Sequence, residues 1–194
     1  MSKAGKTGVT ENTPKNIIFG AGTIHKGLKY EDGKWNIEES IMGATSGGSK
    51  ISIVPEFVDI EADGALVLVK GLKVKTGEVA SMEINLLEVQ EDMIAKAIVG
   101  EVKASEVDAT YKEITTKSNV SEGDYLENIA FVGEKLDGQK IIVIMGNALC
   151  TSGFETEGKN KEGVVGKFTF ECHADITSDL DTLPIKFYYP IPKA

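Results

Sequence analysis

The sequence predicts a mainly β protein with one short helix packed against its strands. Apolar and polar residues alternate with a period of two through most of the chain from Ile17 onward, and glycine-rich turns separate the alternating runs. A single segment instead has its apolar residues at helical spacing. With 194 residues, 41% of them hydrophobic, the chain is long enough to bury a substantial core in one domain.

Two predicted strands, 78–89 and 164–174, divide most cleanly into an apolar and a polar face. The apolar residues of these strands are Ala80, Met82, Ile84 and Leu86 in the first, and Phe168, Phe170 and Cys172 in the second. Successive side chains of a strand point to opposite faces, so the residues between them form a second, polar face. The candidates for this solvated face are Ser81, Glu83, Asn85, Lys167, Thr169, Glu171 and His173.

The remaining strands are predicted from shorter runs. Residues 125–132 and 140–149 flank Asp137 and Gly138, which form a strong hairpin-turn signal. Pro55 within the run 50–58 indicates an edge strand or a bulge, because proline cannot donate a hydrogen bond to a neighbouring strand. The other predicted strands are 65–71, 72–75 and 183–190.

The helix is predicted at about residues 90–100. Its apolar residues fall on one helical face: Met93, Ile94, Ala97 and Ile98. Glu91 and Asp92 lie at its positive N-terminal end, and Gly100 is the predicted C-terminal cap.

Three polar segments complete the chain. Residues 1–16 are predicted to form a flexible N-terminal arm, which leaves 17–194 as a single β domain. Residues 31–49 and 103–124 are long polar stretches inside that domain. The stretch "GATSGGSK" at 43–50 is similar to a phosphate-binding loop, but its last two residues are in the reverse order and a strand is predicted to follow it. We therefore interpret it as a flexible Gly/Ser turn.

No constellation of residues predicts catalysis, a metal or a cofactor. The chain has two histidines, and the adjacent Cys172 and His173 point to opposite faces of a strand, so they cannot easily share an ion. There is no G-x-S-x-G motif, and Cys150 has no nearby cation in the sequence to activate it. We read both cysteines as reduced packing residues and predict a protein that is not an enzyme and needs no cofactor.

The charge and the apolar runs narrow the range of partners. Lys and Arg number 21 and Asp and Glu number 30, which gives a net charge of −9 that repels nucleic-acid phosphates. No apolar run approaches the roughly 20 residues needed to span a bilayer, so we expect no membrane contact. The N-terminus has no apolar stretch typical of a secretory signal, so we expect a cytosolic origin.

Four stretches taken together resemble the major tail protein, or tail tube subunit, of long-tailed bacteriophages. They are "NIIFGAGTIHKGL" at 16–28, the run from Trp35 to Ala65 that contains "VPEFVDIEADGA", "EVASMEINLLEVQEDMIAKAIVG" at 78–100, and "GKFTFECHADITSDLDTLPIKFYYP" at 166–190. The resemblance covers most of the chain from about residue 16 and is weakest at 101–124. Its specificity comes from the number and order of these stretches.

The resemblance implies a β-sandwich or partial barrel of two packed sheets with the helix at its flank. It also implies hexameric rings that stack into a hollow tail tube, through which DNA passes without being tightly bound. The partners would be further copies of this chain and other tail proteins, such as the tape measure, initiator and terminator. The protein would be found in the virion tail, and in the host cytoplasm during assembly.

Two sets of residues follow from this resemblance. The polar residues of strands 78–89 and 164–174 become candidates for the lumen lining or the outer tube wall, and the acidic balance suits a wall that DNA slides past. In this family a long loop commonly contacts the adjoining ring, and 31–49 is the candidate segment. Its proposed contact residues are Trp35, Gly43, Gly47, Gly48, Ser49 and Lys50.

Two alternatives remain. The tube protein of a phage-derived bacteriocin or a type VI-like injection device is not separated from a phage tail tube by sequence. A ligand- or carbohydrate-binding β-sandwich module is an alternative of another class. Such modules usually present clustered aromatic residues, whereas Trp35 is the only tryptophan here. Solution size distinguishes them, because a binding module stays small whereas a tube protein gives rings or filaments.

Overall fold

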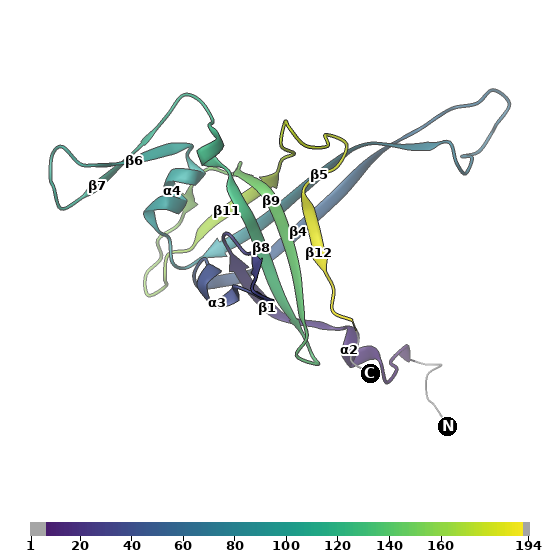
Figure 1. The fold of residues 1–194 in the computed structure, drawn as a ribbon, viewed down its shortest axis with the longest axis horizontal. Coiled ribbons are helices and arrows are strands. Elements are labelled where there is room, and N and C mark those ends of the chain that lie inside the picture. Colours follow the sequence, from purple (N-terminus) through teal and green to yellow (C-terminus); the bar gives the residue numbers. More distant parts are fainter. Residues whose placement is uncertain (1–6, 192–194) are drawn as a thin grey trace.

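A computed structural model describes residues 7–191 and confirms a mainly β protein with packed antiparallel sheets (Figure 1). Eight strands form one sheet in the order β1-β8-β9-β11-β5-β4, with β10 paired to β11 and β12 paired to β9. Their bounds are β1 Ile18–His25, β4 Thr45–Asp59, β5 Lys73–Leu86, β8 Leu126–Lys135, β9 Lys140–Cys150, β10 Glu155–Thr156, β11 Gly166–Cys172 and β12 Ile185–Tyr188.

The sheet bends at β9, because this strand changes its partner along one edge. Its first half pairs with β12, from Ile142 opposite Tyr188 to Met145 opposite Ile185. Its second half pairs with β11, from Ala148 to Cys150. Gly146 lies at the change of partner and donates its N–H to the Pro184 carbonyl over 2.8 Å. A β-carbon at Gly146 would lie 2.9 Å from the Pro184 side chain, so glycine is required at this close approach.

The main core fills the space inside this bend. It is built from the inward faces of β5 and β11 on one side and of β8 and β9 on the other. Phe168, Phe170, Met82, Ile84 and Leu86 are at most 1% exposed. Burying each such side chain contributes about 1.5–3 kcal/mol, so this face fixes the register of the two strands. The apolar faces predicted for 78–89 and 164–174 are therefore confirmed.

A second apolar cluster lies on the other face of the β8–β9 hairpin. Leu28, Ala130, Val132, Ile142 and Ile144 are buried there. They are covered by the two-stranded β2–β3 hairpin (β2 Tyr30–Glu31, β3 Lys34–Trp35) and the short helix α3 (Ile37–Ser40), which supply Trp35 and Ile37. Both faces of β8 and β9 are thus covered, whereas β5 and β11 are covered on one face only.

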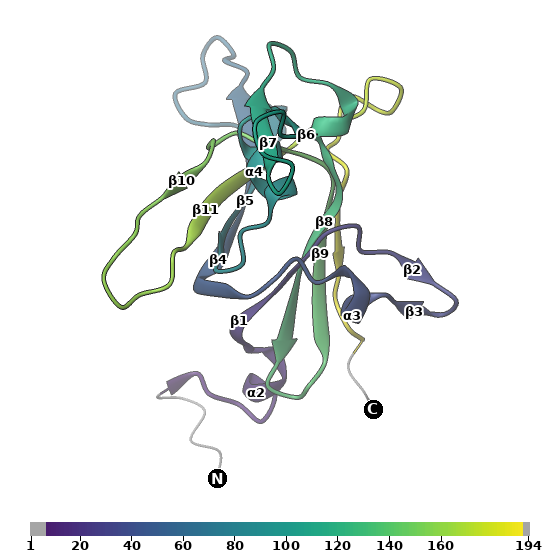
Figure 2. The same cartoon turned by 90° about the vertical axis from the view of Figure 1, so that its left-hand side faces the viewer.

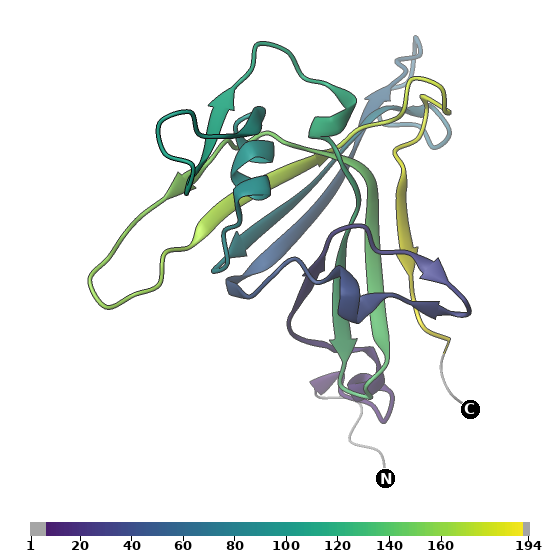
Figure 3. The same cartoon turned by 60° about the vertical axis from the view of Figure 1, so that its left-hand side comes forward.

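The predicted helix is present as α4 (Glu91–Ala97), with Met93 and Ala97 in the main core beside β11 (Figure 3). Its predicted cap is wrong. Gly100 begins the next strand, β6, and the left-handed residue after the helix is Val99, with φ of 50°. The polar stretch 103–124 contains more structure than predicted: β6 (Gly100–Ala104) pairs with β7 (Lys112–Thr116), and a 3₁₀ turn, η1, spans Glu122–Asp124.

Two hairpins extend from the body on opposite sides of the molecule (Figure 1). One consists of β6 and β7, and the other of the distal halves of β4 and β5. In Figure 2, the β2–β3 hairpin and the loop after β10 also project on opposite sides. The prediction of a strand at 65–71 is wrong: these residues form the loop at the tip of the β4–β5 hairpin. The predicted strands 72–75 and 78–89 belong to one continuous strand, β5, which begins one residue later, at Lys73, and ends earlier, at Leu86.

The predicted N-terminal arm lies partly outside the described residues, since 1–6 are not described. Residues Thr13–Asn16 form the single helical turn α2, and Ile17 accepts a hydrogen bond from the N–H of Leu136 over 3.1 Å. No helix within residues 7–191 is long and apolar enough to cross a membrane.

Candidate assembly surfaces

The structure brings six of the predicted solvated residues together on one uncovered face of the sheet. Lys167 lies opposite Asn85, Thr169 opposite Glu83, and Glu171 opposite Ser81. Directly opposite residues of an antiparallel pair share a face, so these three rows form one polar surface. We call the surface made by Ser81, Glu83, Asn85, Lys167, Thr169 and Glu171 the polar face. Its residues are exposed or half-buried, and the residues between them form the core.

His173 is the exception among the predicted residues. It follows the end of β11, and its N–H donates to the Asn147 carbonyl over 2.8 Å. Its ring packs edge-on against Tyr125, with 5.5 Å between the ring centroids, and its Nδ1 lies 3.0 Å from the Glu171 carbonyl oxygen. The prediction that it continues the strand is wrong: β11 ends at Cys172, and only the His173 N–H still bonds to β9.

The polar face carries balanced charge once Lys50 of the neighbouring strand is counted with it. Lys50 of β4 lies opposite Glu83, and its Nζ is 2.6 Å from a Glu83 carboxylate oxygen. Lys50 and Lys167 therefore balance Glu83 and Glu171. The acidic excess of the chain lies on other surfaces, so DNA repulsion by the net charge does not by itself identify this face as a lumen lining.

The segment predicted to be an inter-ring loop is folded. Gly47, Gly48, Ser49 and Lys50 belong to β4, at the edge of the sheet, and Trp35 belongs to β3. Between Thr45 and Ser49 the strand bulges, with φ of 87° at Gly47 and 80° at Gly48, and Asn85 donates its side-chain N–H to the Gly48 carbonyl over 3.1 Å. Glycine accommodates these positive φ angles, and the Gly/Ser composition reflects a bulge rather than a mobile turn.

The β4–β5 arm, which we define as residues 54–79, exposes an extended set of apolar side chains. Sequence reasoning missed it. Leu66, Val67 and Leu68 at its tip are 98%, 78% and 77% exposed. The exposed apolar residues of the arm are Val54, Phe57, Val58, Ile60, Leu66, Val67, Leu68, Val69, Val74 and Val79. Contiguous exposed apolar residues of this extent mark interaction sites.

A few local contacts hold the arm extended. Ile60 donates its N–H to the Leu72 carbonyl over 2.7 Å, just beyond the last paired residues. Lys73 Nζ forms an ion pair with Asp59 over 2.9 Å and lies 5.8 Å from the Phe57 ring centroid. Glu56 pairs with Gly77 and Phe57 with Lys75, so Thr76 is an extra residue of β5 without a partner opposite it in β4. A two-stranded hairpin without a packed face is marginal in water, so these contacts alone give the arm little stability.

A groove lined by aromatic side chains lies between the β2–β3 hairpin and β12. Trp35 packs edge-on against Tyr30 and Tyr188, with ring centroids 5.2 Å and 4.7 Å apart. The groove has a volume of about 450 Å³, and Lys29 and Lys186 also line it. We call it the aromatic groove. It was not predicted from the sequence, because Tyr188 lies far along the chain from Tyr30 and Trp35, which face each other in the β2–β3 hairpin.

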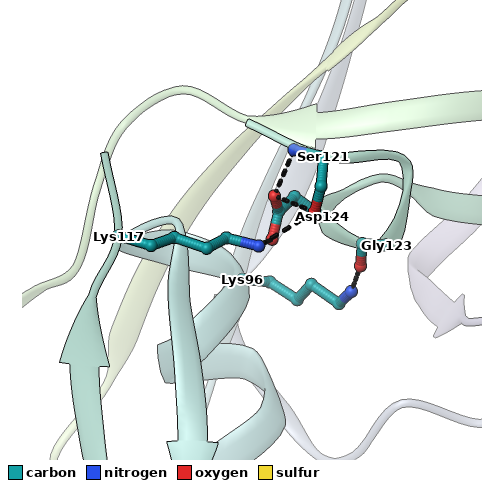
Figure 4. Close-up of polar contacts among 5 residues, drawn as sticks. All are labelled: Lys96, Lys117, Ser121, Gly123 and Asp124. Atoms are coloured by element: carbon teal, nitrogen blue, oxygen red, sulfur yellow. Dashed lines mark hydrogen bonds and ion pairs between the residues drawn. The ribbon is translucent and has the colours of Figure 1, made fainter. Parts of the chain in front are cut away.

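A buried polar cluster joins η1 to the base of the β6–β7 hairpin (Figure 4). The Asp124 carboxylate, whose side chain is 3% exposed, accepts hydrogen bonds from the Ser121 N–H over 2.7 Å and from the Ser121 hydroxyl over 2.9 Å, and pairs with Lys117 Nζ over 2.7 Å. Burial by itself would raise the pKa of Asp124, but the hydrogen bonds from Lys117 and Ser121 outweigh it and lower that pKa. Lys96 of α4 also donates to the Gly123 carbonyl.

His25 and the two cysteines, the side chains best suited to chemistry, occupy buried, structural positions. His25 is fully buried, with its two ring nitrogens 2.7 Å from the Thr23 hydroxyl and 2.9 Å from the Ser40 hydroxyl. Cys150 and Cys172 are free and buried, and burial raises the pKa of the Cys172 thiol. Within residues 7–191, no group of three His, Cys, Asp or Glu side chains is placed to hold a metal ion.

No protein-family model matches this chain, and a search of the curated proteins finds no match either.

Proposed function

We propose that this protein is a self-assembling structural subunit, and that its assembly is the tail tube of a long-tailed phage. The observation that carries the proposal is the β4–β5 arm, whose apolar side chains are exposed on both faces. Leaving them in water forgoes about 25 cal/mol per Å² of apolar surface, and a second protein surface would recover that free energy. The resemblance of the four sequence stretches supports the tail tube as the specific assembly.

The polar face supports the same proposal. β4 is the edge strand of the sheet, and a long edge strand with no partner is a template for pairing with another chain. Closing six such sheets into a ring removes the edges and leaves one face of β5 and β11 toward a channel. We propose that the polar face lines this channel, where its side chains, charge-balanced together with Lys50, let DNA pass without tight binding.

Concentration-dependent assembly is the direct test. Sedimentation velocity and negative-stain microscopy of the purified protein should show rings or tubes as its concentration rises, without any cofactor. A strictly monomeric protein at every concentration, and also in the presence of the initiator of its own tail, would overturn the proposal. The same rings in a bacteriocin or injection device would appear identical, and the genes beside this one would distinguish them.

A carbohydrate-binding module is the second candidate, because the structure clusters Tyr30, Trp35 and Tyr188 around a groove. Aromatic rings stack on the apolar faces of sugars, and adjacent polar groups fix their orientation. Titration with oligosaccharides, followed by the indole NMR signal of Trp35, tests this candidate. Saturable shifts from a protein that stays monomeric would favour it over the tail tube.

A further inference from the structure

The arm tip is apolar and has no strand partner. Residues 65–69 read Ala-Leu-Val-Leu-Val, an apolar run whose two valines favour β structure, yet none of them pairs with another strand in the described chain. The nearest ladder ends at Asp59 and Lys73. Ala65 and Val69 form only local turn hydrogen bonds, with Ala62 and Leu72, so the subunit presents an apolar segment that belongs to no β ladder.

The aromatic groove adjoins a strand that also lacks a partner. β12 pairs with β9 along one edge, and no strand within residues 7–191 pairs with its other edge. Phe187 and Tyr188 of β12 are 59% and 40% exposed. An extended segment that adds to such an edge gains main-chain hydrogen bonds, and pockets for alternate side chains give it specificity.

We propose that residues 65–69 of one subunit add as a strand to the free edge of β12 in a second copy of this chain, with every second aliphatic side chain in the aromatic groove. This inference rests on the proposed self-assembly and names the contact that carries it. Arm and groove are different surfaces, so a contact that the same two copies do not return to each other is heterologous, and such contacts generate rings or open filaments.

The charges favour a second copy over a lipid surface. Glu61 and Asp63 precede the aliphatic tip, and Lys70 follows it, which leaves the tip with a net negative charge. The groove carries Lys29, Lys186 and Glu31, so its net charge is positive on a chain whose total is −9. Acidic residues beside an apolar loop oppose contact with anionic lipids, whereas they complement this groove.

The test uses two variants of the full chain. The arm variant carries Leu66→Asp and Leu68→Asp, and the groove variant carries Tyr30→Ala and Lys186→Glu. Each should reduce self-association at least about tenfold, because apolar and aromatic anchors dominate interfaces. The matched controls, Val107→Asp for the arm and Tyr111→Ala with Lys103→Glu for the groove, alter equally exposed residues of the β6–β7 hairpin and should assemble like the wild type.

Mixing the two variants provides the sharpest readout. Each mixed pair retains one intact arm and one intact groove, so the mixture should form dimers that do not grow through this contact. In wild-type assemblies, amide hydrogen exchange should slow at residues 65–69 and 185–188. Reversing the arm charges (Glu61→Lys with Asp63→Lys) or the groove charges (Lys29→Glu with Lys186→Glu) alone should weaken association. Combining both reversals should strengthen association about three- to fivefold relative to either reversal alone.

The outcomes separate this inference from the proposed function. Normal assembly of the groove variant would overturn the arm–groove contact while leaving self-assembly intact. A wild-type protein that never associates would remove both. Binding of the wild type to vesicles of phosphatidylglycerol and phosphatidylcholine, lost in the arm variant and kept in the groove variant, would assign the arm to a membrane and overturn the inference.

Discussion

Replacing Leu66, Val67 and Leu68 together by Asp is expected to separate folding from assembly. Full burial of one such side chain contributes about 1.5–3 kcal/mol. Because the three are 98%, 78% and 77% exposed, the subunit loses little buried surface, and its free energy of unfolding should fall by about 1 kcal/mol in total. Urea unfolding monitored by the fluorescence of Trp35 measures this change.

The same substitutions should act strongly on association. If a partner buries even half of the exposed part of these side chains, their contribution is about 2–4 kcal/mol, and its loss weakens association about 30- to 1,000-fold. Sedimentation velocity of wild type and variant at matched concentrations measures the shift. Ile176→Asp is the control, since Ile176 is 88% exposed and lies outside the arm. Equal assembly of the triple variant and the wild type would refute the interpretation of the arm as an interface.

Three further predictions follow from single sites. Asp124→Asn should lower the free energy of unfolding by about 2–4 kcal/mol, because it leaves Lys117 and the cap of η1 without their carboxylate. Because the pKa of Asp124 is lowered in the folded protein, the unfolded chain takes up this proton first, and wild-type stability should fall as pH drops below about 3.8. Burial, and to a lesser degree Lys140, lowers the pKa of His25, so the unfolded chain takes up a proton near pH 6.5 before the folded one, and stability should decrease as pH falls below about 6.5. Glu83→Lys should lower the free energy of unfolding by about 0.5–1 kcal/mol, because it places a second positive charge opposite Lys50. It should also slow DNA ejection if the polar face lines the lumen.

Each of these has a clear contrary result. An Asp124→Asn protein within about 0.5 kcal/mol of the wild type would show that the cluster in Figure 4 contributes little. For His25, the control is His25→Gln: if the variant loses stability between pH 6.5 and 5 as the wild type does, another group causes the loss. Unaltered ejection from particles that carry Glu83→Lys would place the polar face away from the channel.

The sequence correctly predicted the strands in which buried and exposed side chains alternate. The alternation in β5 and β11 was read correctly because Met82, Ile84, Phe168 and Phe170 cannot leave the core without a large loss of buried area. The β6–β7 hairpin was missed for the opposite reason. Val102 is partly exposed and its neighbours are mostly charged, so the hairpin has no buried face to impose a pattern.

The errors around glycine have a different physical origin. Gly47 and Gly48 form a bulge within a strand, and Gly100 begins a strand rather than capping a helix. Glycine marks an unusual backbone position or a close approach, but composition alone does not say whether the chain turns, bulges or continues there. The aromatic groove was missed because it needs a long-range contact: the β2–β3 hairpin pairs Tyr30 with Trp35, but Tyr188 reaches them only through the pairing of β12 with β9.

The wrong strand prediction at 65–71 is the most informative error. Strand propensity is a statement about fitting a pleated and half-buried surface, and it is satisfied only when a neighbouring strand supplies the ladder. Local preference and tertiary structure agree along β5, β8, β9 and β11, where the partner lies in the same chain. At the arm tip they disagree, because Leu66 and Leu68 have strand-forming neighbours but no ladder and no core. Such a mismatch is resolved when another surface supplies the missing ladder, and under the proposed self-assembly that surface is the free edge of β12 in the next copy.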